Sequence, residues 1–230
     1  MTTPARQRYD AMWTEAAPAI RAGRVDCDAR LLQGPDPRRG LTLVARPGPA
    51  LAAGFAAALD RLGAIEPDQY RHPAPDLHLT VLSLFTVTDD YAPQLARLDD
   101  YRAAVRAAVA GVPPLEVAFD GLTASRGAVL AQGEPRGPAL DMLRERLRDA
   151  LRARGLDGTL DQRYRLVTAH ATLLRFVRPL AAPEAFADAL AAMRSLPLGV
   201  LRTDELELVV NDWYMTGASL RRVERIKLTG

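Results

Sequence analysis

The chain has 230 residues, 48% of them hydrophobic, and a formal net charge of +2 at pH 7. It is long enough to bury a core, and its composition excludes an intrinsically disordered protein. Cys27 is the single cysteine, which excludes an internal disulfide and a cysteine-rich metal site. The small positive charge permits an anionic substrate without requiring one.

The first 40 residues predict a helix followed by a linker. Residues 4–23 carry a loosely amphipathic pattern that ends at a glycine, and residues 33–40 are dense in turn-forming residues. We therefore expect residues 1–40 to be a helical extension with a linker and residues 41–230 to form the main domain.

The N-terminal helix does not have the pattern of a targeting segment. Asp10 and Glu15 interrupt its apolar positions, which argues against a signal peptide. Nowhere does the sequence approach the roughly 18 unbroken apolar residues that a membrane span needs. We expect a cytoplasmic protein with no membrane partner.

Strands and helices alternate along the main domain. Apolar runs between turn residues predict strands, and apolar residues at helical spacing predict helices. In chain order we predict strand 41–45, helix 47–62, strand 77–87, helix 89–109, strands 115–123 and 128–132, helix 139–154, strand 164–177, helix 183–194, and a closing hairpin of 206–215 and 220–228. This order predicts an α+β fold with helices packed on largely antiparallel sheets. Because a strand-helix-strand unit recurs, we predict a duplicated architecture.

Two of the three histidines belong to His-x-Thr triplets within apolar runs: His78 with Thr80, and His170 with Thr172. Residues two apart in a strand share a face, so each triplet presents an imidazole and a hydroxyl together. Apolar neighbours on both faces predict that each triplet lies in the middle of a central strand. One isolated triplet is usually a hydrogen-bonded core histidine, but two matching triplets favour a catalytic pair. His72, in an expected loop, has no assigned role.

These motifs resemble the two-histidine phosphoesterase superfamily, which includes bacterial RNA 2′,3′-cyclic phosphodiesterases, also called 2′-5′ RNA ligases. The stretch DLHLTVLSLF at 76–85 is similar to the first His-x-Thr strand of that family, and HATLLR at 170–175 is similar to the second. LEVAFDGLTASRGAVLAQG and the leucine-striped helix after it resemble the central segment. The resemblance covers roughly 41–228 and implies two lobes of antiparallel sheets, helices packed outside, and a central active-site cleft. The family usually begins its first strand closer to the N-terminus.

The resemblance implies a metal-independent cyclic phosphodiesterase, a hydrolase that needs no cofactor and acts on an RNA end or nucleotide carrying a cyclic phosphate. Imidazole titrates near neutral pH, so one histidine can take a proton from water while the other protonates the departing ribose oxygen. The threonine hydroxyls would donate hydrogen bonds to the non-bridging oxygens. The sequence does not determine which histidine is the acid, nor the oligomeric state.

Two further residues are candidates for substrate binding. Arg175 could neutralise phosphate, but strict alternation puts it on the face opposite His170, so a structural role fits as well. Tyr164 has the same parity as His170 and could stack on a base, although such aromatics more often belong to the core or rim. Trp213 and Tyr214 either cover the core or line a base pocket.

Two other functions fit the same residues. A noncatalytic RNA- or nucleotide-binding module would keep the cleft without turnover. A 2′-5′ RNA ligase would run the reverse reaction, with an RNA 5′-hydroxyl in place of water. Binding without product would favour the first, and joined product formed only at high RNA-end concentration would show ligation to be a side reaction.

Overall fold

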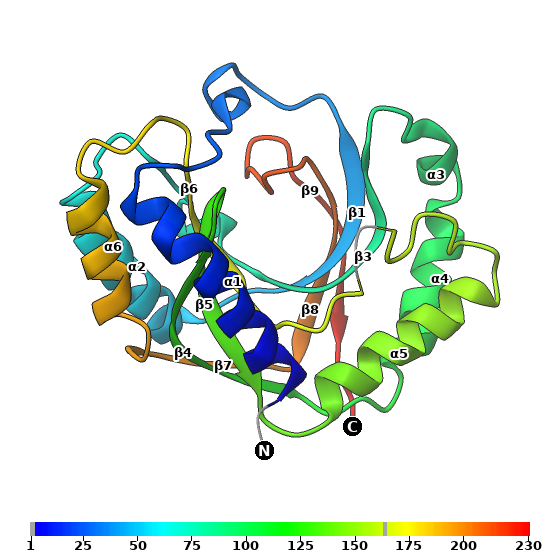
Figure 1. Cartoon of the computed structure of the whole chain (residues 1–230). Helices are drawn as coiled ribbons and strands as arrows, with labels where there is room; N and C mark the ends of the chain where they lie inside the picture. Colours follow the sequence, from blue (N-terminus) through cyan, green and yellow to red (C-terminus); the bar gives the residue numbers. More distant parts are fainter. Residues whose placement is uncertain (1–2, 163–164) are drawn as a thin grey trace.

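The computed structural model describes residues 3–162 and 165–230 (Figure 1). The strands of this described chain are β1 (Arg39–Ala45), β2 (Tyr70–Arg71), β3 (Leu79–Thr88), β4 (Leu115–Ser125), β5 (Ala128–Pro135), β6 (Ala171–Arg175), β7 (Pro197–Thr203), β8 (Glu205–Asn211) and β9 (Arg221–Lys227). The α-helices are α1 (Pro4–Arg21), α2 (Pro49–Gly63), α3 (Ala92–Ala96), α4 (Leu98–Val109), α5 (Ala139–Arg152) and α6 (Pro183–Ala192), and short 3-10 helices cover Ala29–Leu32 and Ala74–Asp76.

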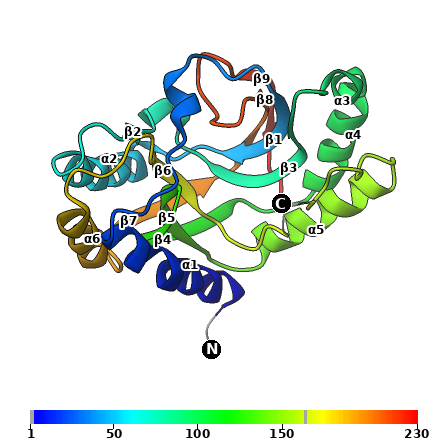
Figure 2. The same cartoon turned by 45° about the horizontal axis from the view of Figure 1, so that its top comes forward.

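The strands form two antiparallel sheets, in the orders β3-β1-β8-β9 and β2-β6-β5-β4-β7. Helices α1 and α2 pack on the five-stranded sheet and α6 packs against both of them, whereas α4 and α5 pack together beside the four-stranded sheet (Figures 1 and 2). The two sheets form two lobes, and the chain passes between them several times. This confirms the predicted α+β fold of antiparallel sheets with helices outside. No helix of the described residues is long and apolar enough to cross a membrane.

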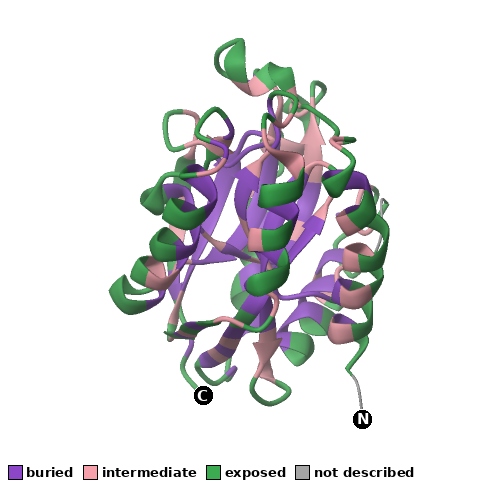
Figure 3. Cartoon of the chain, turned by 60° about the vertical axis from the view of Figure 1, so that its left-hand side comes forward, coloured by how far each residue is buried: buried purple, intermediate pink, exposed green. Residues whose placement is uncertain are grey.

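The core lies between the sheets and their helices. Figure 3 shows buried residues along the strands and inner helix faces, and exposed residues on the outer faces. Helix α5 buries the predicted leucine stripe, which consists of Leu140, Leu143, Leu147 and Leu151. The same face also carries Arg144 and Arg148, whose side chains are 1% exposed. Buried guanidinium groups need hydrogen-bonding partners, and both find them near the pocket described below.

Two predicted elements differ from the structure, and strands β2 and β7 were not predicted. The helix predicted over 89–109 is two helices, α3 and α4, and the strand predicted over 164–177 is reduced to β6. Strand β7 was missed because Pro197 and Gly199 disfavour strands. It lies at the edge of the five-stranded sheet, where proline and glycine are tolerated.

The two triplets are placed only partly as the sequence predicted. His78 and His170 each lie one residue before their strand begins. Strand β6 lies inside its sheet, between β2 and β5, as predicted, whereas β3 lies at the edge of its sheet. The free edge of β3 faces α5, from which Arg144 donates hydrogen bonds to the carbonyl oxygens of Thr80 and Val81 at 3.2 and 2.9 Å. A helix therefore covers this edge, which explains why its apolar residues are buried.

Candidate active site

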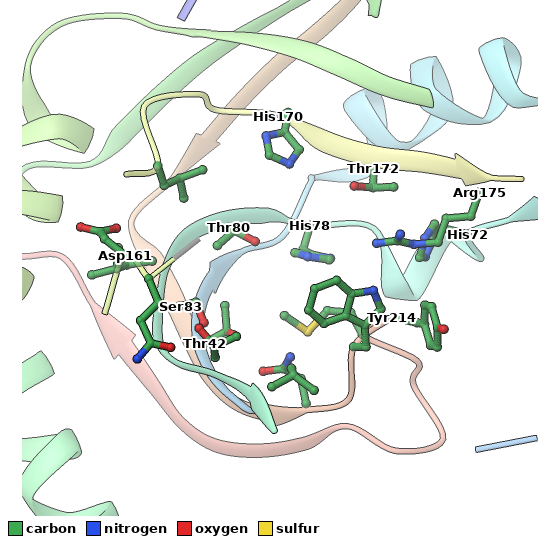
Figure 4. Close-up of a pocket in the computed structure, with 18 residues that line it drawn as sticks. Thr42, His72, His78, Thr80, Ser83, Asp161, His170, Thr172, Arg175 and Tyr214 are labelled. Carbon is green, nitrogen blue, oxygen red and sulfur yellow. The ribbon is translucent and has the colours of Figure 1, made fainter. Parts of the chain in front are cut away.

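A pocket of about 420 Å³ opens between the two sheets, within the usual size range of small-molecule sites (Figure 4). All four residues of the predicted triplets line it. Thr80 and Thr172 lie at the starts of β3 and β6, and His78 and His170 each directly precede these strands. The structure thus brings together two triplets that lie far apart in the sequence.

A β-bulge follows the threonine of each triplet. In β3 the extra residue opposite β1 is Val81, and in β6 the extra residue opposite β5 is Leu173. An extra residue reverses the alternation of faces beyond it. The third residue after each threonine therefore returns to the pocket: Ser83 in β3 and Arg175 in β6.

Arg175 lies in the same pocket as His170, so the placement predicted from strict alternation is wrong. The bulge at Leu173 is the reason. The Nε atom of Arg175 is buried without a hydrogen-bond partner among the described residues, and its guanidinium carbon lies 5.5 Å from the centre of the Tyr214 ring. Burial lowers the pKa of Arg175, although Asp28 opposes the shift. A largely buried guanidinium with an unused donor is suited to binding an anion.

The two catalytic candidates are held by different groups. The Nδ1 atom of His78 lies 2.7 Å from the carbonyl oxygen of Asp76. A carbonyl only accepts, so Nδ1 carries a hydrogen and Nε2 of the neutral ring keeps a lone pair. The Nδ1 atom of His170 lies 2.8 Å from the hydroxyl of Thr168, which both donates and accepts. Either neutral tautomer of His170 fits this contact.

Burial lowers the pKa of both imidazoles to about 4. Nearby positive charge adds to the effect, from Arg46 beside His78 and from Arg144 beside His170. His170 itself also lowers the pKa of His78, which places the two rings within electrostatic reach of each other. Both rings are therefore neutral at pH 7 in the free protein. An anion bound between them would raise both pKa values.

His72 also lines the pocket, which sequence reasoning missed. Its side chain is 4% exposed, and neither ring nitrogen has a hydrogen-bond partner among the described residues. Its backbone N–H donates to the carbonyl oxygen of Leu173 at 2.9 Å, in line with the pairing of β2 and β6. Burial, with Arg175 nearby, lowers the pKa of His72 to about 3. Only strand pairing brings this histidine to the site, and the local sequence gives no signal of it.

The pocket has a basic end and an acidic end. Arg175 and His72 lie toward one side of the histidine pair, and Asp161 lies toward the other (Figure 4). Arg148 donates hydrogen bonds to both carboxylate oxygens of Asp161, at 2.6 and 3.2 Å. Burial alone would raise the pKa of Asp161, but the bonds from Arg148 hold it below its usual value. The carboxylate is therefore charged at neutral pH, and the guanidinium of Arg148 balances its charge.

Aromatic residues complete the basic end. Trp213 and Tyr214 both line the pocket. The Tyr214 hydroxyl donates to Asp28 at 2.8 Å, and the guanidinium of Arg38 lies 5.5 Å from the centre of the Trp213 ring. Tyr164 lies outside the described residues.

The fold resembles several solved structures. TT0787 of Thermus thermophilus matches with a TM-score of 0.58 and 18% identity, over 83% of this chain and 98% of that one. E. coli LigT in its apo form matches with a TM-score of 0.56 and 17% identity, over 84% and 99% of the two chains. A complex of LigT with 3′-AMP matches with a TM-score of 0.53 and 16% identity, over the same shares. No curated protein matches the chain by sequence.

Two lobes of antiparallel sheet that each bring a His-x-Thr triplet to one pocket define the two-histidine phosphoesterase fold. The model of the 2′-5′ RNA ligase superfamily matches residues 48–213, which is well over half of the chain and includes both triplets. The chain belongs to this superfamily, as its motifs predicted.

Proposed function

We propose that the protein opens a cyclic phosphate, at an RNA end or on a nucleotide, by general acid and base catalysis with His78 and His170. The observation that carries this proposal is that both His-x-Thr triplets line one pocket between the sheets. Membership of a superfamily of phosphoesterases and ligases supports it.

The proposed reaction needs one proton removed and one supplied. As water attacks phosphorus, a neutral imidazole takes its proton, and the other imidazole, protonated, gives a proton to the departing ribose oxygen. Thr80 and Thr172 donate hydrogen bonds to the non-bridging oxygens, where negative charge increases in the transition state. Because both rings are neutral in the free protein, the charge of the bound phosphate is what allows one to become protonated.

The proposed substrate fits the polarity of the pocket. Arg175 would bind a phosphate oxygen through its unused donor. Trp213 and Tyr214 offer aromatic surface to a base at the basic end. The volume of about 420 Å³ is suited to a nucleotide-sized ligand. LigT has been crystallised with 3′-AMP, a ligand of this class.

The test is hydrolysis of adenosine 2′,3′-cyclic monophosphate and of a short RNA ending in a cyclic phosphate, with EDTA present throughout. The wild type should release a phosphomonoester, and His78→Ala or His170→Ala should each lower kcat by about 10²- to 10⁴-fold. His72→Asn is the matched control, because it changes a histidine of the same pocket outside the triplets. His72→Asn should lower kcat by less than about tenfold, since it removes no proton-transfer group.

The outcomes separate the proposal from its alternatives. Unchanged activity in both triplet variants would rule out catalysis by the histidine pair. Tight binding of the RNA end by the wild type with no product would show a noncatalytic binding module instead. Joined RNA formed in preference to hydrolysis would show a ligase. Loss of all wild-type activity in EDTA would show that a metal is required.

A further inference from the structure

Helix α1 lies outside the segment that matches the superfamily, which begins at residue 48. It packs against β4 and α6 on the five-stranded sheet (Figures 1 and 2). Its buried residues are Ala5, Tyr9, Ala16, Ala19 and Ile20. Of these, only Tyr9 carries a side-chain polar group, and its side chain is completely buried. A buried hydroxyl needs partners, and those of Tyr9 lead to the pocket.

The Tyr9 hydroxyl joins β5 to the residue that precedes His170. It donates to the carbonyl oxygen of Gly133 at 3.1 Å and accepts from the backbone N–H of Ala169 at 3.0 Å. The N–H of Gly133 also lies 3.3 Å from it. Burial raises the pKa of Tyr9 to about 12, so the hydroxyl keeps its hydrogen at neutral pH.

This hydroxyl lies where the pairing of β5 with β6 stops. The last paired residues are Ala131 and Ala171, and continuing the same register would set Gly133 opposite Ala169. The two backbones already approach closely, because a Cβ on Gly133 would lie 1.9 Å from the carbonyl oxygen of Ala169. The Tyr9 hydroxyl thus satisfies polar groups of β5 and of the segment before β6, just beyond the last paired residues.

The segment from Thr168 to His170 has further supports. Arg144 donates to the carbonyl oxygen of Thr168 at 2.8 Å, and the Thr168 hydroxyl contacts Nδ1 of His170. The backbone that carries His170 is therefore held by α5 through Thr168 and by α1 through Ala169. Loss of either support would let the imidazole move relative to the pocket, and general acid or base catalysis is sensitive to such displacement.

We propose that Tyr9 is a positioning residue for His170, and that α1 is part of the active-site scaffold and not an independent extension. The Tyr9 hydroxyl sets the separation between β5 and Ala169, and so the direction in which the His170 ring enters the pocket. This proposal rests on the proposed function for its effect on turnover. It makes a separate statement about the position of His170, which can be measured without turnover.

The test is Tyr9→Phe, which removes only the hydroxyl. It should lower kcat on the cyclic nucleotide at least tenfold with KM within twofold, because the substrate still binds while proton transfer is misaligned. Tyr101→Phe is the matched control, a buried tyrosine of α4 that packs against Phe85. It should leave kcat unchanged. Equal kcat values for the two variants would overturn the proposal.

Stability and position need their own controls. Ile20→Val, on the same buried face of α1, lowers stability without touching the hydroxyl. A kcat that falls equally in Ile20→Val and Tyr9→Phe would show a merely structural role, and overturn the proposal. NMR of the imidazole signals gives a readout without turnover. Tyr9→Phe should change the His170 signal and its titration more than those of His78.

An unchanged His170 signal would overturn the positioning role even if the wild type shows no turnover. Failure of the proposed function alone would instead appear as inactive wild type with a shifted His170 signal in Tyr9→Phe. If Tyr9→Phe does not fold, hydrogen exchange at the Ala169 amide of the wild type tests whether this amide donates to the Tyr9 hydroxyl. Slow exchange supports the bond to the Tyr9 hydroxyl, and fast exchange overturns it.

Discussion

Replacing Arg144 by methionine should destabilise the protein strongly. The guanidinium of Arg144 donates to the carbonyl oxygens of Val81, Thr80 and Thr168 at 2.9, 3.2 and 2.8 Å, and its side chain is 1% exposed. A hydrogen bond to a charged group contributes about 1.5 to 3 kcal/mol, but the desolvated guanidinium costs several kcal/mol to bury. Methionine removes that cost and leaves three buried carbonyls without their donor.

We expect a net loss of about 3 to 5 kcal/mol in the free energy of unfolding, because each carbonyl left without its donor costs about 1 to 3 kcal/mol and the relieved burial of the guanidinium offsets part of the sum. For a chain of this size, that corresponds to a fall in Tm of about 6 to 20 °C. Since domains are usually stable by about 5 to 15 kcal/mol, the variant should still fold at 25 °C. Urea unfolding followed by circular dichroism measures the change directly.

Two comparisons make this prediction specific. Arg144→Lys keeps the charge but loses the planar fork, so it should recover only part of the stability. Arg152→Met on the same helix removes an arginine that is 49% exposed and, among the described residues, paired only with Asp149. It should change stability by less than about 0.5 kcal/mol. A loss below about 1 kcal/mol for Arg144→Met would refute the reasoning, because it would mean that the three carbonyls do not need the guanidinium.

Three further predictions concern pH, a buried ion pair and a glycine. Burial lowers the pKa of all three histidines below the unfolded value of 6.5, so the unfolded chain binds their protons first as pH falls. Their contribution to stability is complete above about pH 6.5 and is lost toward about pH 4, at up to about 1.4 kcal/mol per pH unit for each histidine. The free energy of unfolding, measured with urea at each pH, should fall less steeply with decreasing pH in His72→Asn than in the wild type. An equal pH dependence would contradict the lowered pKa of His72. Asp161→Asn should cost about 2 to 4 kcal/mol because it takes a bidentate partner from Arg148, and a thermal melt shifted by less than about 2 °C would disprove this. Gly121 has a φ of 84°, and a Cβ there would lie 1.9 Å from a carbonyl oxygen, so Gly121→Ala should cost at least about 2 kcal/mol in urea unfolding. Gly127→Ala, with its nearest contact at 3.8 Å, should be nearly neutral.

The sequence was sufficient to predict the class of fold and the two triplets, because periodicity and short motifs are local properties. It could not predict which way Arg175 points. Leu173 and Leu174 are both buried, so the sequence at the bulge is an unbroken apolar run. Such a run does not indicate that the side chains change face there. Whether the bulge is present depends on the register with β5, which is set by the whole sheet.

The same limit applies to residues that reach the site by tertiary contact. His72 enters the pocket because β2 pairs with β6, and Tyr9 contacts Ala169 because α1 packs on the five-stranded sheet. Arg144 follows a leucine in the helical stripe and has the sequence pattern of an ordinary flanking charge. Only the packing of α5 against β3 shows that it is buried.

The paired bulges also set how the chain tolerates insertions and deletions. Each bulge adds one residue to its strand, so the residues directly beyond it face the side opposite to the one that strict alternation predicts. Deleting Leu173 would remove the bulge and the extra residue together, so Arg175 would stand two residues after Thr172 and still face the pocket. Deleting Val81 would do the same for Ser83 in the other half. We therefore expect deletion of a bulged residue to keep these side chains in the pocket, whereas a change that abolishes the bulge without shortening the strand would turn them away.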